Sequence, residues 1–508
     1  MISAAPKRQN HRPRQRSQYT IVTIIGWNDP SNPYETMFPD MNVPRYVSEM
    51  FHVFIFLAVI ENIIRFCRGK TIIRLNDSIA SISSGLVQDC FRIHIRSLEV
   101  FCYCHVFEHF RLTTLPWNSL STWLYCFIFV DFGFYWAHRL AHEVNFIWAI
   151  HQAHHSGEDF TLVAALRQAV LQPFTAWITY VPMAVIGIPP QTFLVHLQLT
   201  ELYMLWIHTE AIKSLGYLEL IFNCPSHHRV HHARNRKYID KNYGALFIFW
   251  DKLFGTYEEE DPNEPPVYGL VHPVESYDPF YLQFHAWISM YHNIQQTQGL
   301  WNKFCIPFKG PGWAPGKPRL GYIDEIPEIK QPVEYWNPKI SMWKKIYVVW
   351  HSAIIVIFYH ELSTKSDQLT QIRIFLGVVC ILATLTTMGS WLENKEKAIR
   401  MEGIRCAVFL LLEKYLIPLT SINEMDSSFQ SPIILTFRIT YLISIIICTF
   451  YELFCLAINL FKHLKLQFKQ TKLHQILSLI AFVNKNKLNP FDTSNPHSYW
   501  SQNIWSQF

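Results

Sequence analysis

The sequence predicts an all-α fold, a polytopic integral membrane protein built from helices. Half of the 508 residues are hydrophobic and only 16% are charged, whereas about a quarter of the residues in soluble domains are charged. The apolar residues also gather into runs long enough to enter a bilayer core of about 30 Å. We see no alternating apolar pattern of the kind that marks the strands of a membrane β-barrel.

The basic N-terminus precedes the first apolar run. Lys7 to Arg16 carry several positive charges, and the patch that follows, Ile21 to Trp27, is too short for the core of a secretion signal. The positive-inside tendency therefore places this end in the cytosol.

The eleven cysteines form no CxxC pair, which favours a reducing compartment. A net charge of +5 without a long basic stripe argues against nucleic acid as a partner.

Apolar runs place the membrane segments in order. The first expected span is Phe51 to Phe66, and the second is Leu112 to Val130. The uncharged run between Arg167 and Glu201 is too long for one crossing, and the sequence Gly187-Ile188-Pro189-Pro190 breaks it, so it predicts a helical hairpin. Three to five further segments are expected in Ile346–His360, Ile374–Leu392, Ile404–Leu419 and Ile433–Phe461.

Histidines cluster around the hairpin. Eleven of the 24 histidines lie between His138 and His232. Their spacing is HxxxH once and HxxHH twice, which on a helix presents imidazoles on one face. His208 stands alone at the end of the second hairpin arm. The boxes with His208 give the candidate metal ligands His138, His142, His151, His154, His155, His208, His228, His231 and His232.

This set has too many nitrogen donors for one ion, so the sequence predicts a centre with two metals. A set without thiolates disfavours Mg²⁺ and Ca²⁺ and leaves Fe, Zn, Cu or Mn. Metal-bound imidazoles usually donate their other N–H to a neighbouring group, and Glu143 and Glu210 are candidates for that role. We expect His227 and His196 to lie outside the centre, and we interpret His94 and His351 as core residues.

Metals beside an apolar hairpin indicate a lipid substrate that enters from the bilayer. A zinc hydrolase of the HExxH type is excluded because that motif is absent. Oxidation of an unactivated C–H bond suits histidine-bound iron better. A divalent-metal transporter remains an alternative from another class, although its ligands should lie near the middle of the spans. A structural membrane scaffold would not require the box spacing.

Together the three boxes resemble the fatty acid hydroxylase and sterol desaturase superfamily. Their surroundings are similar to the alkylglycerol monooxygenase branch of it, over about residues 70–325 and, by hydropathy alone, over the later spans. Beyond about Met425 we find no resemblance. The segments that carry the narrower resemblance are Arg74–Ser78, Asp131–Glu143, Trp148–Ser156, Trp206–Glu210, Pro225–Asn235, Asp240–Gly244, Trp250–Gly255 and Gly310–Gly321.

The resemblance implies a di-iron monooxygenase. Its expected reaction hydroxylates the ether-bearing carbon of 1-O-alkylglycerols and lyso-alkyl phospholipids with O₂ and tetrahydrobiopterin, and releases a fatty aldehyde and a glycerol derivative. A sterol or sphingolipid hydroxylase or desaturase that takes electrons from cytochrome b5 would share every ligand, so it stays an alternative. The pterin site and the oligomeric state are left open.

The resemblance and the hydropathy together predict location and organisation. We expect a multi-pass protein of the endoplasmic reticulum membrane whose boxes face the cytosol on the same side as the 209–345 stretch. Within that stretch, the glycine and proline residues of 309–318 exclude a regular helix. The predicted parts are a basic N-terminal segment (1–47), a membrane-embedded fatty acid hydroxylase-like catalytic domain (48–325), C-terminal transmembrane helices (326–461) and a polar basic tail (462–508).

Overall fold

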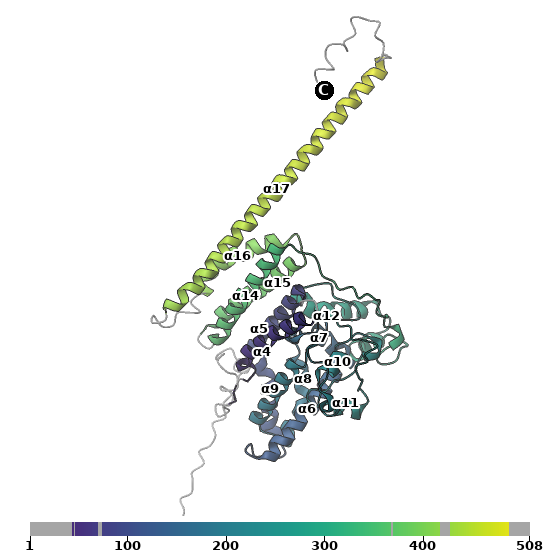
Figure 1. The fold of residues 1–508 in the computed structure, drawn as a ribbon, viewed down its shortest axis with the longest axis vertical. Helices are drawn as coiled ribbons and strands as arrows, with labels where there is room; N and C mark the ends of the chain where they lie inside the picture. The colour runs from purple at the N-terminus through teal and green to yellow at the C-terminus, as the bar shows by residue number, and fades with distance from the viewer. Residues whose placement is uncertain (1–42, 45, 70–73, 367–368, 417–426, 487–508) are drawn as a thin grey trace, which may run out of the picture. The chain divides into compact units, whose positions relative to one another are not determined.

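The computed structural model describes residues 43–44, 46–69, 74–366, 369–416 and 427–486, and these residues are almost entirely helical (Figure 1). Loops separate the helices, most of them between residues 207 and 341. The β pairing within the described residues consists of isolated bridges, such as Phe222 with Phe247. The all-α prediction is therefore confirmed for this part of the chain, whereas nearly all of the basic N-terminal segment lies outside it. The helices are α3 (Tyr46–Glu49), α4 (Phe51–Cys67), α5 (Leu75–Phe110), α6 (Leu120–Glu143), α7 (Asn145–His155), α8 (Pro173–Ile186), α9 (Pro190–Trp206), α10 (Pro225–His231), α11 (Phe249–Phe254), α12 (Pro279–Gln296), α13 (Leu300–Phe308), α14 (Met342–Thr364), α15 (Gln371–Leu392), α16 (Ala398–Leu416) and α17 (Ser427–Asn486), with short 3₁₀ turns η1 (Leu162–Leu166), η2 (Gly216–Leu220), η3 (Arg236–Tyr238) and η4 (Ile323–Glu325).

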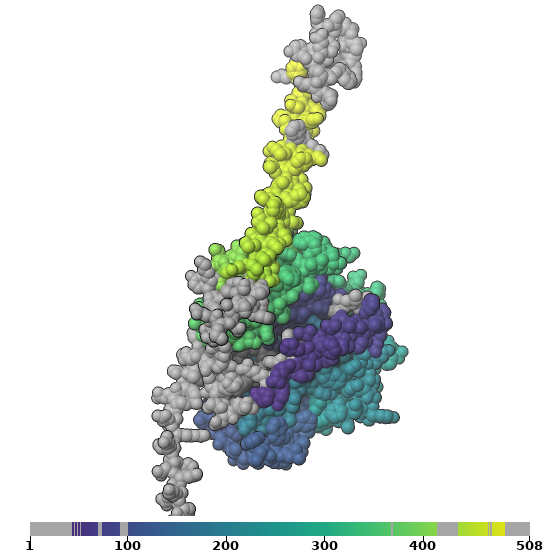
Figure 2. Space-filling model, turned by 60° about the vertical axis from the view of Figure 1, so that its left-hand side comes forward, coloured from purple at the N-terminus to yellow at the C-terminus, as the bar shows by residue number. Residues whose placement is uncertain are grey.

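Helix α5 packs against α8 and also against α14 and α15. It therefore connects the helices that follow it directly with helices from the later part of the chain. Figure 2 shows the N-terminal helices (purple) between the C-terminal helices (green) and the helices that follow α5 (blue). Near its end, the ring of Tyr103 stacks on Phe193 of α9 at 4.1 Å, and its hydroxyl donates to the carbonyl of Ile188. The sequence predicts no membrane segment in the region of α5, because charged residues interrupt its apolar ones.

The predicted hairpin is confirmed as α8 and α9. Gly187 ends α8 with φ of 98°, and a Cβ atom there would lie 2.1 Å from the carbonyl oxygen of Thr113, so only glycine fits this turn. Arms of 14 and 17 residues are about 21 and 26 Å long. Both are shorter than the bilayer core, so the hairpin enters the apolar region without a full-length crossing in either arm.

Four helices in the described part of the chain are long and apolar enough to cross a membrane: α6, α14, α15 and the Leu435–Phe482 part of α17. Three predicted spans need correction. Helix α4 is present but has 17 residues, about 26 Å. The Leu112–Val130 span begins only at Leu120, after a turn that contains Pro116. Of the Ile404–Leu419 run, the part up to Leu416 belongs to α16, and the rest lies outside the described residues. Helix α16 begins at Ala398 and contains several charged residues, so it is not among the four.

The contacts divide the chain into two units, one that ends at Thr440 and one that begins at Tyr441. The first part of the predicted polar tail, from residue 462 to Asn486, is helical, because it continues α17. Helix α13 ends at Phe308, and no regular helix covers 309–318, as predicted. The four-part division of the chain stays a prediction.

A buried ion pair joins the C-terminal helices. Arg405 donates to Glu402 at 2.6 Å and to Thr384 of α15 at 3.1 Å, and Tyr347 of α14 donates to the same carboxylate. Glu402 is fully buried. Three helices therefore share one charged cluster, in which each charge depends on the other for solvation.

Replacing Glu402 with alanine is expected to destabilise this helix packing strongly. The change leaves the Arg405 guanidinium buried without its carboxylate, which costs about 3–5 kcal/mol. Thermal unfolding of the detergent-purified protein measures the loss. Glu361→Ala is the matched control, since its pair with Lys365 is 30% exposed on both sides and should contribute less than about 1 kcal/mol. Equal melting temperatures for the two variants would contradict the role of the cluster.

Candidate metal centre

All three histidine boxes lie on helices, as predicted. Helix α6 carries His138 and His142 one turn apart, α7 carries the second box, and α10 carries the third, with His232 as the residue that follows its last turn. His208 follows the end of α9. None of the nine rings is more than 8% exposed.

The nine imidazoles form two groups, and within each group the candidate ligand atoms lie within 4.8 Å of one another. The groups share a wall, because the rings of His155 and His232 stack at 4.3 Å. Neither group draws on one box alone. We call them cluster 1, formed by His138, His142, His151, His155 and His231, and cluster 2, formed by His154, His208, His228 and His232.

The HxxHH spacing explains this exchange between boxes. In each box the first and last histidines are four residues apart and face one cluster, whereas the middle one is rotated away and reaches the other. His154 thus leaves its box for cluster 2, and His231 leaves its box for cluster 1. The sequence pattern suggests a single face of donors in each box, so it does not predict this division.

The ring nitrogens point at one another as ligands of a common ion would. In cluster 1 the Nε2 atoms of His138 and His151 are 3.1 Å apart, and in cluster 2 those of His208 and His228 are 3.0 Å apart. Two ligands about 2.0–2.1 Å from one ion are separated by about 2.9–3.4 Å at octahedral or tetrahedral angles. The spacing therefore fits a metal ion at the centre of each cluster.

Burial prepares these rings for metal binding. It lowers the pKa of His154 to about 4 and that of His208 to about 3, so both are neutral at physiological pH. Only the neutral ring can coordinate a metal. The Nε2 atoms of His142 and His232 are buried without a hydrogen-bond partner, which is costly unless a ligand satisfies them.

Backbone carbonyls orient four of the nine rings from outside, including that of His208, whose Nδ1 lies 2.7 Å from the carbonyl of Met204. The Nδ1 atom of His138 lies 2.9 Å from the carbonyl of Tyr243, that of His231 lies 2.9 Å from Lys241, and that of His154 lies 2.9 Å from Arg167. Such bonds fix the tautomer and leave Nε2 for the metal. Two further contacts use side chains, since His151 faces the amide oxygen of Gln172 and His142 lies 3.4 Å from Asp240.

Buried carboxylates hold the loop that supplies two of these carbonyls. Asp251 accepts hydrogen bonds from the backbone N–H groups of Tyr243 and Gly244, and Asp131 accepts from those of Leu246 and Phe247. The sequence analysis missed the role of Asp131, which it names only as the first residue of a segment that carries the resemblance. A single acidic residue directly after a long uncharged run is the signal that could have identified Asp131 as a buried hydrogen-bond acceptor.

The two carboxylates predicted to support the rings accept hydrogen bonds from other groups. Glu143 accepts from Arg139 and Arg319, and Glu210 accepts from Arg65 of α4 and from Tyr268. Tyr268 in turn stacks on Phe160, which packs against rings of cluster 2. The direct supporting contacts therefore belong mainly to backbone carbonyls, and any influence of Glu143 and Glu210 passes through the groups that they hold.

The histidines expected to lie apart from the centre do so within the described residues. His227 is in neither cluster and packs on Tyr257. His196 packs between Trp123 and Phe127, and His351 belongs to the C-terminal cluster around Arg405. The side chain of His94 lies outside the described part of the structure.

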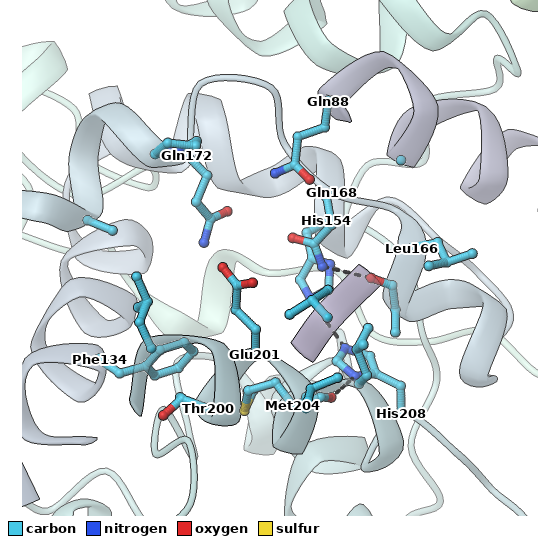
Figure 3. Close-up of a pocket in the computed structure, with 18 of the residues that line it drawn as sticks. Gln88, Phe134, His154, Leu166, Gln168, Gln172, Thr200, Glu201, Met204 and His208 are labelled. Atoms are coloured by element: carbon cyan, nitrogen blue, oxygen red, sulfur yellow. Dashed lines mark hydrogen bonds between the residues drawn. The ribbon is translucent and has the colours of Figure 1, made fainter. Parts of the chain in front are cut away.

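A cavity of about 490 Å³ opens onto both clusters. Its wall includes His138 and His151 of cluster 1. It also includes His154 and His208 of cluster 2 (Figure 3). Helices α4, α8 and α9 supply mostly apolar side chains to the rest of the wall. A cavity of this size and lining suits a small apolar ligand or part of a lipid chain.

The comparisons with known proteins agree with this architecture. Residues 123–256 match the fatty acid hydroxylase family, and residues 344–430 match the alkylglycerol monooxygenase C-terminal domain, which extends the resemblance further along the chain than the sequence motifs do. The chain is also 33% identical over 139 residues to the ornithine lipid hydroxylase OlsE of Rhizobium tropici, covering 27% of this chain and 41% of that protein. No solved structure matches.

Longer matches define the family. The chain is 46% identical over 402 residues to alkylglycerol monooxygenase of Homo sapiens, covering 78% of this chain and 89% of that protein. It is 42% identical to alkylglycerol monooxygenase of Xenopus tropicalis, covering 75% and 85%. The chain therefore belongs to the alkylglycerol monooxygenase family.

Proposed function

We propose that this protein is a membrane di-iron monooxygenase that cleaves ether lipids. Its reaction hydroxylates the ether-bearing carbon of 1-O-alkylglycerols and lyso-alkyl phospholipids with O₂ and tetrahydrobiopterin. The hemiacetal that results collapses to a fatty aldehyde and a glycerol derivative. The observation that carries the proposal is the pair of buried histidine clusters that face one apolar cavity, in a chain whose relatives are named alkylglycerol monooxygenase.

The clusters would hold two iron ions through the nine histidines. When bound, the ions supply O₂ activation and accept the electrons that the pterin provides. The chain supports that chemistry by keeping the rings neutral and by fixing their tautomers through the carbonyls of Tyr243, Arg167 and Lys241. Burial also excludes bulk water from the clusters.

The cavity wall would hold the alkyl chain and present one carbon to the metals. Oxygen lone pairs stabilise radical or cationic character on the adjacent carbon, so the C–H bond next to the ether oxygen is the weakest along the chain. Positioning then decides where the chemistry occurs. The apolar side chains of α4 and α9 at the cavity suit a chain that arrives from the bilayer.

The electron donor separates this proposal from its nearest rival. Sterol desaturases share part of the sequence, for example ERG3B of Gibberella zeae at 29% identity over 159 residues. Purified protein should release fatty aldehyde from a 1-O-alkylglycerol with tetrahydrobiopterin and O₂, and reduced cytochrome b5 should not replace the pterin. Oxidation of a sterol with cytochrome b5, without aldehyde release, would contradict the proposal.

We place the clusters on the cytosolic side of the endoplasmic reticulum membrane, because pterin and reductants are supplied from the cytosol and basic residues surround the third box. In sealed microsomes, added protease should cleave the 209–345 stretch. Protection of that stretch until detergent is added would contradict the orientation. An epitope at a lumenal site of a resident protein serves as the control for sealed vesicles.

Glutamine at Glu143 or Glu210 is expected to lower activity, at most by the 10–100-fold that follows loss of a group in direct contact with a metal ligand, because each carboxylate acts through the arginine that it holds. Each change removes a charge that holds an arginine near the clusters. Metal content should stay close to that of the unmodified protein. Glu259→Gln, an exposed carboxylate, is the control. Complete loss of activity together with loss of metal would instead make either residue a ligand.

A further inference from the structure

The start of helix α5 has no role in the metal centre as described so far, although Arg74–Ser78 is among the segments that carry the resemblance. Its two charged residues contact the loop that begins directly after the second box. Arg74 donates to Asp159 at 3.1 Å and to Glu158 at 2.9 Å. Asp77 accepts from the backbone N–H of Asp159 at 3.3 Å. The first turn of α5 therefore holds this loop in place.

The same loop ends at Arg167, whose side chain is only 2% exposed. The guanidinium donates to the Oδ1 atom of Asp77 at 2.7 Å and to Ser81, one turn further along α5, at 3.1 Å. It also donates to Ser156, the residue that follows the second box, at 3.2 Å. A Cβ atom at Gly157 would lie 3.2 Å from its Nε atom, so the loop backbone passes directly beside it. Arg167 therefore joins α5 to both ends of the loop.

The backbone of Arg167 contacts a candidate metal ligand. Its carbonyl oxygen lies 2.9 Å from the Nδ1 atom of His154, and a carbonyl can only accept, so the ring donates to it. The Nε2 atom of the same ring then faces cluster 2, 3.3 Å from the Nε2 atom of His208 (Figure 3). A continuous set of contacts therefore runs from Asp77 through Arg167 to His154.

This ion pair suits orientation better than stability. The side chains of Asp77 and Arg167 are 6% and 2% exposed. A buried pair adds little net stability, because the cost of removing both charges from water offsets much of their attraction. The charge-assisted hydrogen bonds of a guanidinium are directional, however, and these bonds have partners on α5 and in the loop. They fix the residue whose carbonyl orients the ring of His154.

We propose that Asp77 is a positioning residue for cluster 2, which acts through Arg167 on the ring of His154. The inference rests on the proposed function in that the nine histidines hold two metal ions. It assigns a role in metal binding to α5, a helix that supplies no histidine to either cluster. Because His154 belongs to cluster 2, the effect of Asp77 should be confined to that cluster.

A cycle of double variants tests this restriction. Zinc binds imidazole nitrogens and has no redox chemistry, so the affinity of the full-length purified protein for Zn²⁺, measured against a colorimetric chelator, reports on the ligands alone. The His231→Ala protein keeps cluster 2 intact, and the His154→Ala protein keeps cluster 1 intact.

Adding Asp77→Ala should weaken Zn²⁺ binding about 3–10-fold in the His231→Ala protein, which is less than the 10–100-fold that follows loss of a direct contact with a ligand. In the His154→Ala protein the same change should alter the affinity by less than about twofold, the usual error of additivity. Equal weakening in both proteins would show a general folding defect and would overturn the inference. An unchanged affinity in both proteins would also overturn it.

Glu402→Gln is the matched control, because it removes the carboxylate of another buried arginine pair, in α16. It should lower the melting temperature and leave the Zn²⁺ affinity unchanged in both proteins. If Asp77→Ala does not fold, Asp77→Asn takes its place, since its amide keeps an oxygen that accepts from Arg167. The same contrast between the two proteins is then expected, with a smaller loss, and equal affinities would again overturn the inference.

Failure of the proposed function gives a different result. If Zn²⁺ binding shows the expected contrast but the iron-loaded protein releases no fatty aldehyde, the function is wrong and the positioning role of Asp77 stands. If aldehyde is released but the contrast is absent, the function stands and the inference is wrong. A protein that binds no Zn²⁺ through these histidines would overturn both.

Discussion

Replacing His154 or His231 with alanine is expected to reduce pterin-dependent release of fatty aldehyde to below about 1% of the unmodified level. Even groups that only support a ligand typically change activity 10–100-fold, and these two residues would be ligands themselves. Each is the histidine that leaves its own box for the opposite cluster. His154→Ala should therefore lose metal from cluster 2, and His231→Ala should lose metal from cluster 1, about one of two equivalents in each case.

The variants should remain folded, because the membrane helices are held by their own backbone hydrogen bonds and by packing. Size-exclusion profiles and helical content of the purified proteins check this. His227→Gln is the matched control, since His227 adjoins the third box but belongs to neither cluster, and it should keep both metals. Undiminished pterin-dependent activity in His154→Ala and His231→Ala would defeat the assignment of these boxes as the reacting centre.

The candidate ligands are predictable from sequence because helical periodicity is local. Residues four apart share a helix face whatever the rest of the fold does, so the pairing of His138 with His142 follows from their spacing alone. The hairpin is predictable for a similar reason, since Gly187 and the proline pair interrupt an apolar run within a few residues. Both features depend only on neighbours along the chain.

Other features depend on contacts that no local pattern contains. The carbonyls of Tyr243 and Lys241 that orient two rings belong to the backbone, and any residue type supplies a carbonyl. The sequence analysis missed helix α5, because charges such as Asp89 interrupt its apolar residues and a membrane span is recognised by an uninterrupted apolar run. Packing on several other helices holds α5 in place. The division of each HxxHH box between two clusters likewise requires the mutual placement of α6, α7 and α10.

Exchanging the metals is the second experiment with a large expected effect. Chelation should abolish aldehyde release, and ferrous iron should restore it. Zinc accepts the same imidazole ligands at about 2.0–2.1 Å but has no redox chemistry. The zinc-loaded protein should therefore be folded and inactive, with a thermal stability near that of the iron-loaded protein. Ligand binding stabilises the native state by about 4 kcal/mol at a thousandfold excess over Kd, so the metal-free protein should unfold first.

This comparison separates oxidation from the other roles that buried histidines can have. A structural centre would need only a filled site, so zinc and iron would serve equally well. A hydrolytic centre would work with zinc, because lowering the pKa of a bound water requires a Lewis acid and no electron transfer. Aldehyde release by the zinc-loaded protein at the level of the iron-loaded protein would therefore rule out the monooxygenase reaction. We expect activity with iron alone, and only when both clusters are filled. This expectation follows from the proposed reaction, in which both clusters act on one carbon held in the cavity that they line.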